Sequence, residues 1–296
     1  MYAFGPLHRR LPRAANANAV VDPATGDVTT TTVLFSGQKL SVIDRVQTGP
    51  MSGWGPTRGG GAPAIVFLRS GVFECKTPTE YVFTDATYVK CYDAAHEYRR
   101  QRLADGGEAY TLLCPDPELM QEAFGGAYYQ AACSSEIHYR HLRLYRALRC
   151  EQLDELEAEE LALNLLAEVS EAFGTGRDVT PAGPAVRRRL HAAQAFVAAD
   201  PAADHRLSEV AAVAGCSEFH FARLFRQETG QSLRGYRRRL RTRMALRLIS
   251  EGESDLTTVA LDCGFNTHSH MTSTFRTELG RTPSAAREKI ALKLAS

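Results

Sequence analysis

Arg223 and Arg226 lie three residues apart, together with Phe219 and Ala222, on the outward face of an expected helix whose opposite face is apolar. A helix with an exposed basic face is suited to contact the phosphates and base edges of DNA. About 50 residues later a second expected helix turns polar side chains outward. Its outward residues are His268, Ser269, Thr272, Ser273 and Arg276. The two segments predict a nucleic-acid contact made in two places.

The elements around the first segment have the order of a helix-turn-helix unit. An amphipathic helix over Leu207–Ala214 precedes a short turn that contains Gly215. Ser217 is suited to cap the next helix, because its hydroxyl can accept a hydrogen bond from an otherwise free amide of the first turn. In that helix Phe221, Leu224 and Phe225 fall on one face, as packing against the first helix requires. One such unit is only moderately specific, since any helical hairpin can show the pattern.

The scheme occurs a second time, which makes the prediction far more specific. Leu256–Leu261 forms the first helix, residues 262–265 the turn, and Thr267–Leu279 the second helix. The intervening helix, Leu233–Ser250, contains seven arginines and has an expected length of about 27 Å at ~1.5 Å per residue. That length is close to the ~34 Å between neighbouring major-groove segments on one face of DNA. We expect part of this set to bind phosphates and part to be solvated: Arg234, Arg237, Arg238, Arg239, Arg241, Arg243 and Arg247.

The net charge of +1 conceals an asymmetry along the chain. Residues 185–296 contain 18 Lys and Arg against 11 Asp and Glu, a net charge of +7, and the rest of the chain carries −6. A basic terminal third on an acidic protein is typical of a nucleic-acid-binding module. The alternative, a solvated charged surface, is not excluded by an excess of this size.

Residues 215–230, followed by Tyr236 and Arg238, resemble the first half of the AraC/XylS-type DNA-binding domain. Residues 260–265, followed by Ser269, His270, Phe275, Gly280 and Pro283, resemble its second half. The resemblance covers about residues 185–290 and implies two sets of contacts. Base readers are expected at Phe219, Ala222, Arg223, Arg226, His268, Ser269, Thr272 and Ser273, with Arg223 foremost because Arg binds guanine with two hydrogen bonds. Phosphate contacts are expected at Ser217, Arg237, Arg238, Arg241, Thr267 and Arg276.

The region from Thr29 to about Cys114 favours short strands separated by turn residues. The expected strands are 30–35, 40–46, 64–69, 72–76, 81–83, 87–92 and 109–114. Helices are expected over Pro117–Phe124, Ser134–Cys150 and Leu153–Phe173, the last with an apolar stripe that includes Leu156. The helical pair is expected to cover its own domain and could also contact a second subunit. Residues 34–126, most clearly 64–73, are similar to the cupin-type sensor and dimerisation half of such regulators.

An effector or thiol-sensing site is one interpretation of several residues in this half. Trp54 lies in a Gly-rich stretch, 53–61, that is expected to be a mobile lid. Cys75, Cys91 and Cys114 fall in expected strands, either as a thiol or soft-metal sensor or as small buried hydrophobes. A metal-dependent cupin enzyme needs several His ligands, whereas His96 is the only His of the strand-rich region. We therefore expect no metal, no cofactor and no enzyme activity.

His138 and His141 lie three residues apart on one expected helix, and we predict that both are surface groups. The seven Cys are an odd number in no dense pattern, which favours reduced thiols over a disulfide framework. The sequence contains no apolar run of the roughly 20 residues that a membrane span needs, and the first residues lack the apolar segment of a signal peptide.

These observations predict an α+β protein with a cupin-like antiparallel β-barrel and helical pair, followed by an all-α domain with two helix-turn-helix units. The expected divisions are a flexible arm at 1–28, a sensor and dimerisation domain at 29–173, a linker at 174–184 and a DNA-binding domain at 185–296. The expected function is a cytoplasmic, sequence-specific transcription regulator, an activator by resemblance. Its expected partners are double-stranded promoter DNA, a second copy, RNA polymerase and a small-molecule effector, and no membrane.

Overall fold

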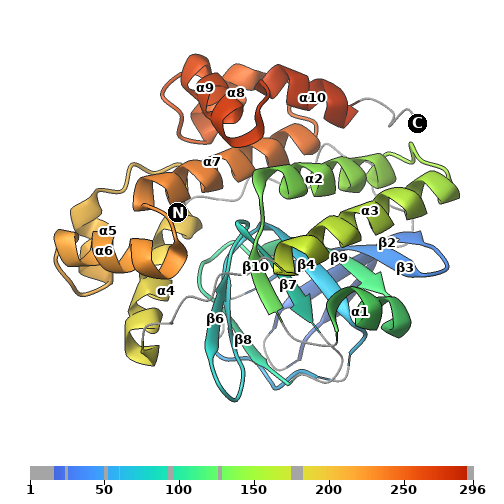
Figure 1. The fold of residues 1–296 in the computed structure, drawn as a ribbon, viewed down its shortest axis with the longest axis horizontal. Helices are drawn as coiled ribbons and strands as arrows, with labels where there is room; N and C mark the ends of the chain where they lie inside the picture. The colour runs from blue at the N-terminus through green and yellow to red at the C-terminus, as the bar shows by residue number, and fades with distance from the viewer. Residues whose placement is uncertain are drawn as a thin grey trace.

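A computed structural model of the chain describes residues 17–23, 26–49, 53–59, 61–92, 97–125, 129–174 and 183–291. Strands occupy its first half and helices its second, as the sequence predicts (Figure 1). The predicted residue His96 and most of the predicted linker lie outside the described residues. Among those described, no helix is both long and apolar enough to cross a lipid bilayer.

The strands form two antiparallel sheets. The larger sheet has the order β1-β2-β3-β9-β4-β7-β10 and the smaller one β6-β5-β8. The predicted barrel is thus present as two sheets that share a core, and backbone pairing among the described residues does not join them into one. The bounds are β1 Asn18–Val21, β2 Val28–Ser36, β3 Leu40–Thr48, β4 Ala64–Ser70, β5 Phe73–Lys76, β6 Tyr81–Thr84, β7 Tyr88–Tyr92, β8 Arg99–Arg102, β9 Glu108–Pro115 and β10 Tyr129–Ala132.

The larger sheet is buried on both faces, and β4 shows how. Side chains of a strand alternate between faces. Ile65 and Phe67 therefore point into the core under the helices, whereas Val66 and Leu68 point into the core shared with Phe73 of the small sheet. Burial on both sides explains why β4 is almost wholly apolar.

Three helices follow the strands: α1 Pro117–Phe124, α2 Ser135–Arg149 and α3 Glu155–Gly174. Figure 1 shows α2 and α3 side by side over the larger sheet. α3 buries Ala162, Leu165 and Val169 against it, so this helix covers its own domain, as predicted. All three helices agree with the predicted ranges to within two residues.

Three strands have no counterpart in the predicted set. β1 lies within the segment predicted to be a flexible arm and pairs with β2, although Val20 and Val21 are both exposed. β8 consists of charged and amide residues only, and β10 pairs with β7. None of the three shows the alternation of apolar and polar residues on which the prediction relied.

The C-terminal domain is all-helical and contains two small cores. Helices α4 to α7 surround the first core, which is centred on Phe221, Phe225 and Tyr236. The second core lies among α7 to α10 and includes Tyr139 and Leu142 of α2. In Figure 1, α7 runs from α5 and α6 to α8, α9 and α10. The bounds are α4 Pro184–Ala199, α5 Leu207–Val213, α6 Glu218–Thr229, α7 Leu233–Ser250, α8 Leu256–Asp262, α9 His268–Leu279 and α10 Pro283–Ala291.

The two domains meet in a polar as well as apolar junction. The Tyr236 hydroxyl donates a hydrogen bond to the buried Asp85 carboxylate, which precedes β7. Arg243 of α7 donates to the carbonyl of Cys133 at 2.7 Å, ahead of α2. At the small sheet, His191 of α4 lies with its Nδ1 2.7 Å from Glu74 Oε1. The C-terminal domain is therefore held to the first domain through the first turn and the middle of α7 and through α4.

His138 and His141 lie in this junction, so the prediction that they are surface groups is wrong. The rings are 1 % and 0 % exposed. His141 stacks on Phe67 of β4, with ring centroids 4.4 Å apart. Burial, together with the nearby Arg69 and Arg243, holds the pKa of both rings well below the usual value, and both are therefore neutral at neutral pH.

Candidate nucleic-acid interface

The first helix-turn-helix unit consists of α5 and α6. Gly215 in the turn has a φ of 61°, a left-handed conformation that Gly adopts readily. The hydroxyl of Ser217 accepts a hydrogen bond from the amide of His220 at 3.4 Å, which confirms the predicted N-cap. Phe221 and Phe225 are fully buried and fix the rotation of α6 about its axis. Their burial turns the opposite face of the helix to solvent.

All four predicted base readers of α6 lie on that exposed face. Phe219 is 83 % exposed, a large value for an aromatic ring, and Ala222 lies beside it. Arg223 and Arg226 are exposed, and neither guanidinium has a hydrogen-bond or ion-pair partner within the described part of the chain. Two unpaired guanidinium groups and an exposed ring on one helix face are available to an external partner.

The second unit, α8 and α9, repeats this arrangement with a turn one residue longer. An added Cβ at Gly264 would collide with the carbonyl oxygen of Ala202, so only Gly fits here. Thr267 caps α9 by accepting a hydrogen bond from the His270 amide at 3.0 Å. Met271 and Phe275 are fully buried and orient α9 as the Phe pair orients α6.

The predicted base readers of α9 divide into two groups. His268, Ser269 and Ser273 are exposed. The Ser273 hydroxyl donates to the His270 carbonyl at 2.9 Å and can still accept a hydrogen bond. Thr272 is half-buried and its hydroxyl oxygen is covered, so this side chain does not present its polar atom to a partner. α9 therefore offers fewer polar groups than the sequence predicts.

The predicted phosphate contacts differ in how free their side chains are. Arg276 is exposed without a partner among the described residues. The hydroxyls of Ser217 and Thr267 accept helix amides and keep their hydrogen atoms for a phosphate. Arg238 binds Glu278 at 2.7 Å, and Arg237 binds Asp204 at 2.7 Å. These two would have to leave or share their carboxylates to reach DNA.

Arg241 does not fit the predicted phosphate role. Its guanidinium is buried and donates to the carbonyl oxygens of Pro201, Ala202 and Ala203 at 2.8, 3.0 and 3.1 Å. The side chain ties the loop before α5 to the middle of α7. Arg243 is likewise buried, and Arg247 binds Glu251 at 2.8 Å. The repeated arginines of α7 are thus largely structural.

Replacing Arg241 with Ala is expected to lower the free energy of unfolding by about 1–3 kcal/mol, because three half-buried carbonyls lose their donor. The salt dependence of DNA binding should not change. Urea unfolding and a salt titration of DNA affinity measure the two quantities. Arg234→Ala, which removes an exposed arginine of the same helix, serves as the control and should leave stability unchanged. Unchanged stability with a flatter salt dependence would restore Arg241 to the phosphate contacts.

The residues predicted for effector or thiol sensing do not converge on one place. Cys91 lies in the core under the helices, whereas Cys75 lies between the sheets and Cys114 packs beside that second core. Burial raises the pKa of the Cys114 thiol, which disfavours the reactive thiolate. Trp54 is half-buried against Tyr81. Within the described ranges, no three His, Cys, Asp or Glu residues are placed to hold a metal ion.

Comparison with known proteins locates the similarity in the same helices. The family profile described as a helix-turn-helix domain matches residues 210–289. An HTH-type transcriptional regulator of Mycobacterium tuberculosis is 34 % identical over 29 % of this chain and 34 % of its own length. An uncharacterized HTH-type transcriptional regulator of Haemophilus influenzae is 25 % identical over 36 % of this chain and 35 % of its own length.

A solved structure from Chromobacterium violaceum, a transcriptional regulator described by its AraC-type DNA-binding domain, is 27 % identical. The match covers 36 % of this chain and 94 % of that one, with a TM-score of 0.34. The chain spans about a third of the length of the curated relatives it matches. Residues 210–289, which the family profile matches, run from within α5 to α10 and include the motifs quoted in the sequence analysis. Residues 210–289 of this chain therefore form a helix-turn-helix domain, and the motifs within them are the ones that resemble the AraC/XylS type.

Proposed function

We propose that the protein is a sequence-specific DNA-binding transcription regulator that presents α6 and α9 to neighbouring major-groove segments of promoter DNA. The observation that carries this proposal is the exposed face of α6, on which Arg223 and Arg226 have no partner among the described residues. The helix of 18 residues between the two units supports it, because its length of about 27 Å approaches the ~34 Å between successive groove segments.

We infer that the two recognition helices contribute unequally. α6 presents two guanidinium groups and an exposed aromatic ring, whereas α9 presents the imidazole of His268, the hydroxyls of Ser269 and Ser273 and, near its end, the single guanidinium of Arg276. An Arg discriminates guanine through two simultaneous hydrogen bonds, and a hydroxyl bonds to either kind of base edge. We infer that sequence readout belongs chiefly to α6, while α9, Arg276 included, supplies affinity.

Replacing Arg223 with Ala is expected to cost about 1–3 kcal/mol of binding free energy on the preferred site and to relax the preference at one base pair. Selection of bound DNA from a random pool identifies that site, and gel-shift competition measures the change. Arg276→Ala is the matched control, since it should lower the affinity for all DNA sequences by about the same factor. A base preference that survives in Arg223→Ala would remove this residue from the readout. A pool without enrichment would contradict the proposed function itself.

We further propose that the regulator acts as a dimer, activates transcription through RNA polymerase, responds to an effector in its first domain, and is not an enzyme. Leu156 supports the dimer, because it is 76 % exposed on α3 rather than buried with the stripe to which it belongs in the sequence. The seven Cys all lie in the described ranges and none forms a disulfide there, which supports a place in the reducing cytoplasm. In the same gel shifts, a complex that contains one protein copy would contradict the dimer.

A further inference from the structure

The turns that precede the two recognition helices rest on one stretch of chain, α4 and the loop that follows it. In the first unit, Arg189 of α4 donates to the carbonyl oxygens of the turn residues 214–215, which lead into α6. In the second unit, the turn lies against the loop 200–205, because a Cβ added to Gly264 would collide with the carbonyl oxygen of Ala202. We call residues 200–205 the spacer loop, since they belong to the first unit and contact the second.

The contact at Gly264 leaves no space between the two backbones. A Cβ at this position would also lie 2.7 Å from the Cα of Ala202, which is closer than packed atoms approach. Gly215 has the same place in the first unit, but a Cβ there would meet the flexible side chain of Arg189 at an ordinary 3.4 Å. Both glycines have a left-handed φ, 61° at Gly215 and 74° at Gly264. The two turns therefore share a conformation and differ in this backbone contact.

The spacer loop keeps its own shape through local contacts. The amide of Ala203 donates to Asp200, to the carbonyl oxygen at 3.3 Å and to Oδ1 at 3.2 Å. Nε2 of His205 lies 2.9 Å from the same carbonyl oxygen. Phe196 of α4 packs on the His205 ring, with ring centroids 4.6 Å apart. The loop is thus a folded piece of structure, as a spacer requires.

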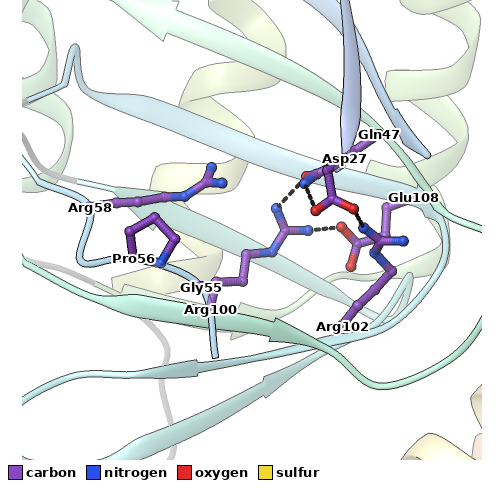
Figure 2. A pocket seen from close by; sticks show the side chains of 8 residues that line it. All are labelled: Asp27, Gln47, Gly55, Pro56, Arg58, Arg100, Arg102 and Glu108. Carbon is purple, nitrogen blue, oxygen red and sulfur yellow. Dashed lines mark hydrogen bonds and ion pairs between the residues drawn. The ribbon is translucent and has the colours of Figure 1, made fainter. Parts of the chain in front are cut away.

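Arg241 holds the backbone of the spacer loop to α7. An arginine that binds a carboxylate fixes a side chain, as Arg100 does with Glu108 in the polar cleft of the first domain (Figure 2). Arg241 instead donates to three consecutive carbonyl oxygens, those of residues 201–203. Three consecutive carbonyls meet one guanidinium only when the backbone follows one particular course. This contact therefore fixes the course of the loop itself.

Arg237, one turn earlier on α7, holds the far end of the spacer loop. Its guanidinium donates to the carbonyl oxygen of His205 at 2.9 Å and to Asp204 Oδ1 at 2.7 Å. The loop is therefore fastened to α7 by two arginines. Because α7 contributes to the cores of both units, the loop, this helix and the second turn form a closed set of contacts where the units meet.

A single helix does not by itself fix the angle between two small units. Contacts between small structural units ordinarily permit relative motion, so each unit would be free to rock about α7. A second contact away from the helix axis removes this freedom. Packed backbones cannot move into one another, so the spacer loop prevents the second turn from approaching the first unit. Arg241 prevents the loop from moving out of the way.

We propose that the spacer loop fixes the distance and the rotation between α6 and α9, and so determines the number of base pairs between the two sequence elements that the protein reads. Arg241 and Gly264 are positioning residues in this arrangement, and neither has to touch DNA. The inference rests on the proposed function, because it requires a protein that reads DNA with both helices. One added base pair moves a groove segment by about 3.4 Å and rotates it by about 35°, which is more than packed backbones can follow.

Binding to DNA of altered spacing tests the proposal. Selection from a random pool identifies the preferred site, and one base pair is then removed or inserted between its two elements. The unaltered protein should lose affinity about tenfold or more for either altered site, because one helix loses its base contacts. Arg241→Ala should lose about threefold or less, because its units can adjust and keep the base contacts of both helices. Equal losses in the two proteins would overturn the proposal, and so would an unaltered protein that accepts all three spacings equally.

Gly264→Ala and Gly215→Ala form a matched pair of variants. Each places Ala at a left-handed φ, so the two carry similar backbone strain. Gly264→Ala also pushes the spacer loop away from the second turn and should change the ratio of affinities for the three spacings about threefold or more. Gly215→Ala should keep the ratio of the unaltered protein. An unchanged ratio in Gly264→Ala would contradict the role of the contact, and if this variant does not fold, the Arg241→Ala measurement replaces it.

A measurement without DNA separates this proposal from the proposed function. Spin labels carried by unnatural amino acids at Ala222 and Ser269, both exposed, report the distance between α6 and α9. The distribution of distances should be narrow in the unaltered protein and broader in Arg241→Ala. Arg234→Ala, which removes an exposed arginine of the same helix, should keep it narrow.

Equal widths in all three proteins would overturn the proposal even if the selection yields a preferred site. A distribution that broadens only in Arg241→Ala would support the spacer loop even if the random pool shows no enrichment, and it is then the reading of DNA that fails.

Discussion

Replacing Tyr236 with Phe is expected to lower the free energy of unfolding by about 2–4 kcal/mol, although only one oxygen atom is removed. The Tyr236 hydroxyl donates to Oδ2 of Asp85, a carboxylate that is 1 % exposed. The other oxygen, Oδ1, accepts from the amide and the hydroxyl of Thr87 at 2.7 and 2.6 Å. In the variant, Oδ2 would remain buried without its donor from α7.

Burial raises the pKa of the Asp85 carboxyl in spite of these donors, which shows that desolvation outweighs the hydrogen bonds at this site. Removing one donor adds to a cost that is already present. The lost bond also joins the two domains, so the variant should loosen α7 from the first domain. Urea unfolding measures the stability, and hydrogen exchange in α7 measures the loosening.

Tyr139→Phe is the matched control for this substitution. Tyr139 is also fully buried at the junction, but its hydroxyl has no hydrogen-bond partner in the described structure. Removing an unsatisfied buried hydroxyl should leave stability unchanged or raise it. If both variants lost the same amount of stability, the hydrogen bond to Asp85 would not be the cause of the loss in Tyr236→Phe.

Acidification below about pH 6.5 is expected to destabilise the protein through His138 and His141. The folded-state pKa of both rings is depressed, so the unfolded chain binds more protons than the folded one once the pH falls below the unfolded value of about 6.5. Stability is therefore fully present above that value and decreases as the pH falls. Each His contributes a slope of up to ~1.4 kcal/mol per pH unit.

The surroundings explain why protonation is unfavourable here. Arg69 of β4 and Arg243 of α7 face the two rings from opposite domains, and three of the four ring nitrogens are buried without a partner. The nearby Asp44 carboxylate forms an ion pair with Arg69, at 2.5 Å. Asp85 acts in the opposite direction, since a carboxyl with a raised pKa gains stability on acidification.

A comparison of variants isolates the histidine contribution from that of Asp85. His141→Phe keeps the stack on Phe67 and removes one titrating ring, so its loss of stability between pH 7.5 and 5.0 should be clearly smaller than in the unaltered protein. His220→Gln removes an exposed His of α6 and should leave the pH dependence as it was. Urea midpoints at several pH values test this, and equal slopes for all three proteins would contradict the role of the buried rings.

The helix-turn-helix units could be predicted because their determinants are local. The spacing of Phe221 and Phe225 sets the buried face of α6, and Ser217 caps it from the adjacent position. The same holds for Thr267 and α9. Signals of this kind lie within a few residues of the structure that they specify, and the predicted helices accordingly agree with the observed ones.

The errors concern residues whose environment comes from distant segments. The polarity of His141 and its spacing on α2 indicate a surface residue, but its ring stacks on Phe67 of β4 and is fully buried. Arg241 shares its helix and spacing with exposed arginines, yet the loop 201–203 folds over it. The charged strand β8 is stabilised by Asp27 and Glu108, which no pattern within 99–102 reveals.

The sharing of a core between α2 and the second helix-turn-helix unit has a consequence for protein synthesis. Tyr139 and Leu142 are made about a hundred residues before most of the side chains that bury them, which belong to α7 to α10. A domain that leaves the ribosome first folds first. Until α7 to α10 have been made, the apolar patch of the first domain is therefore in contact with solvent or with a chaperone. During this interval the growing chain is most prone to aggregate.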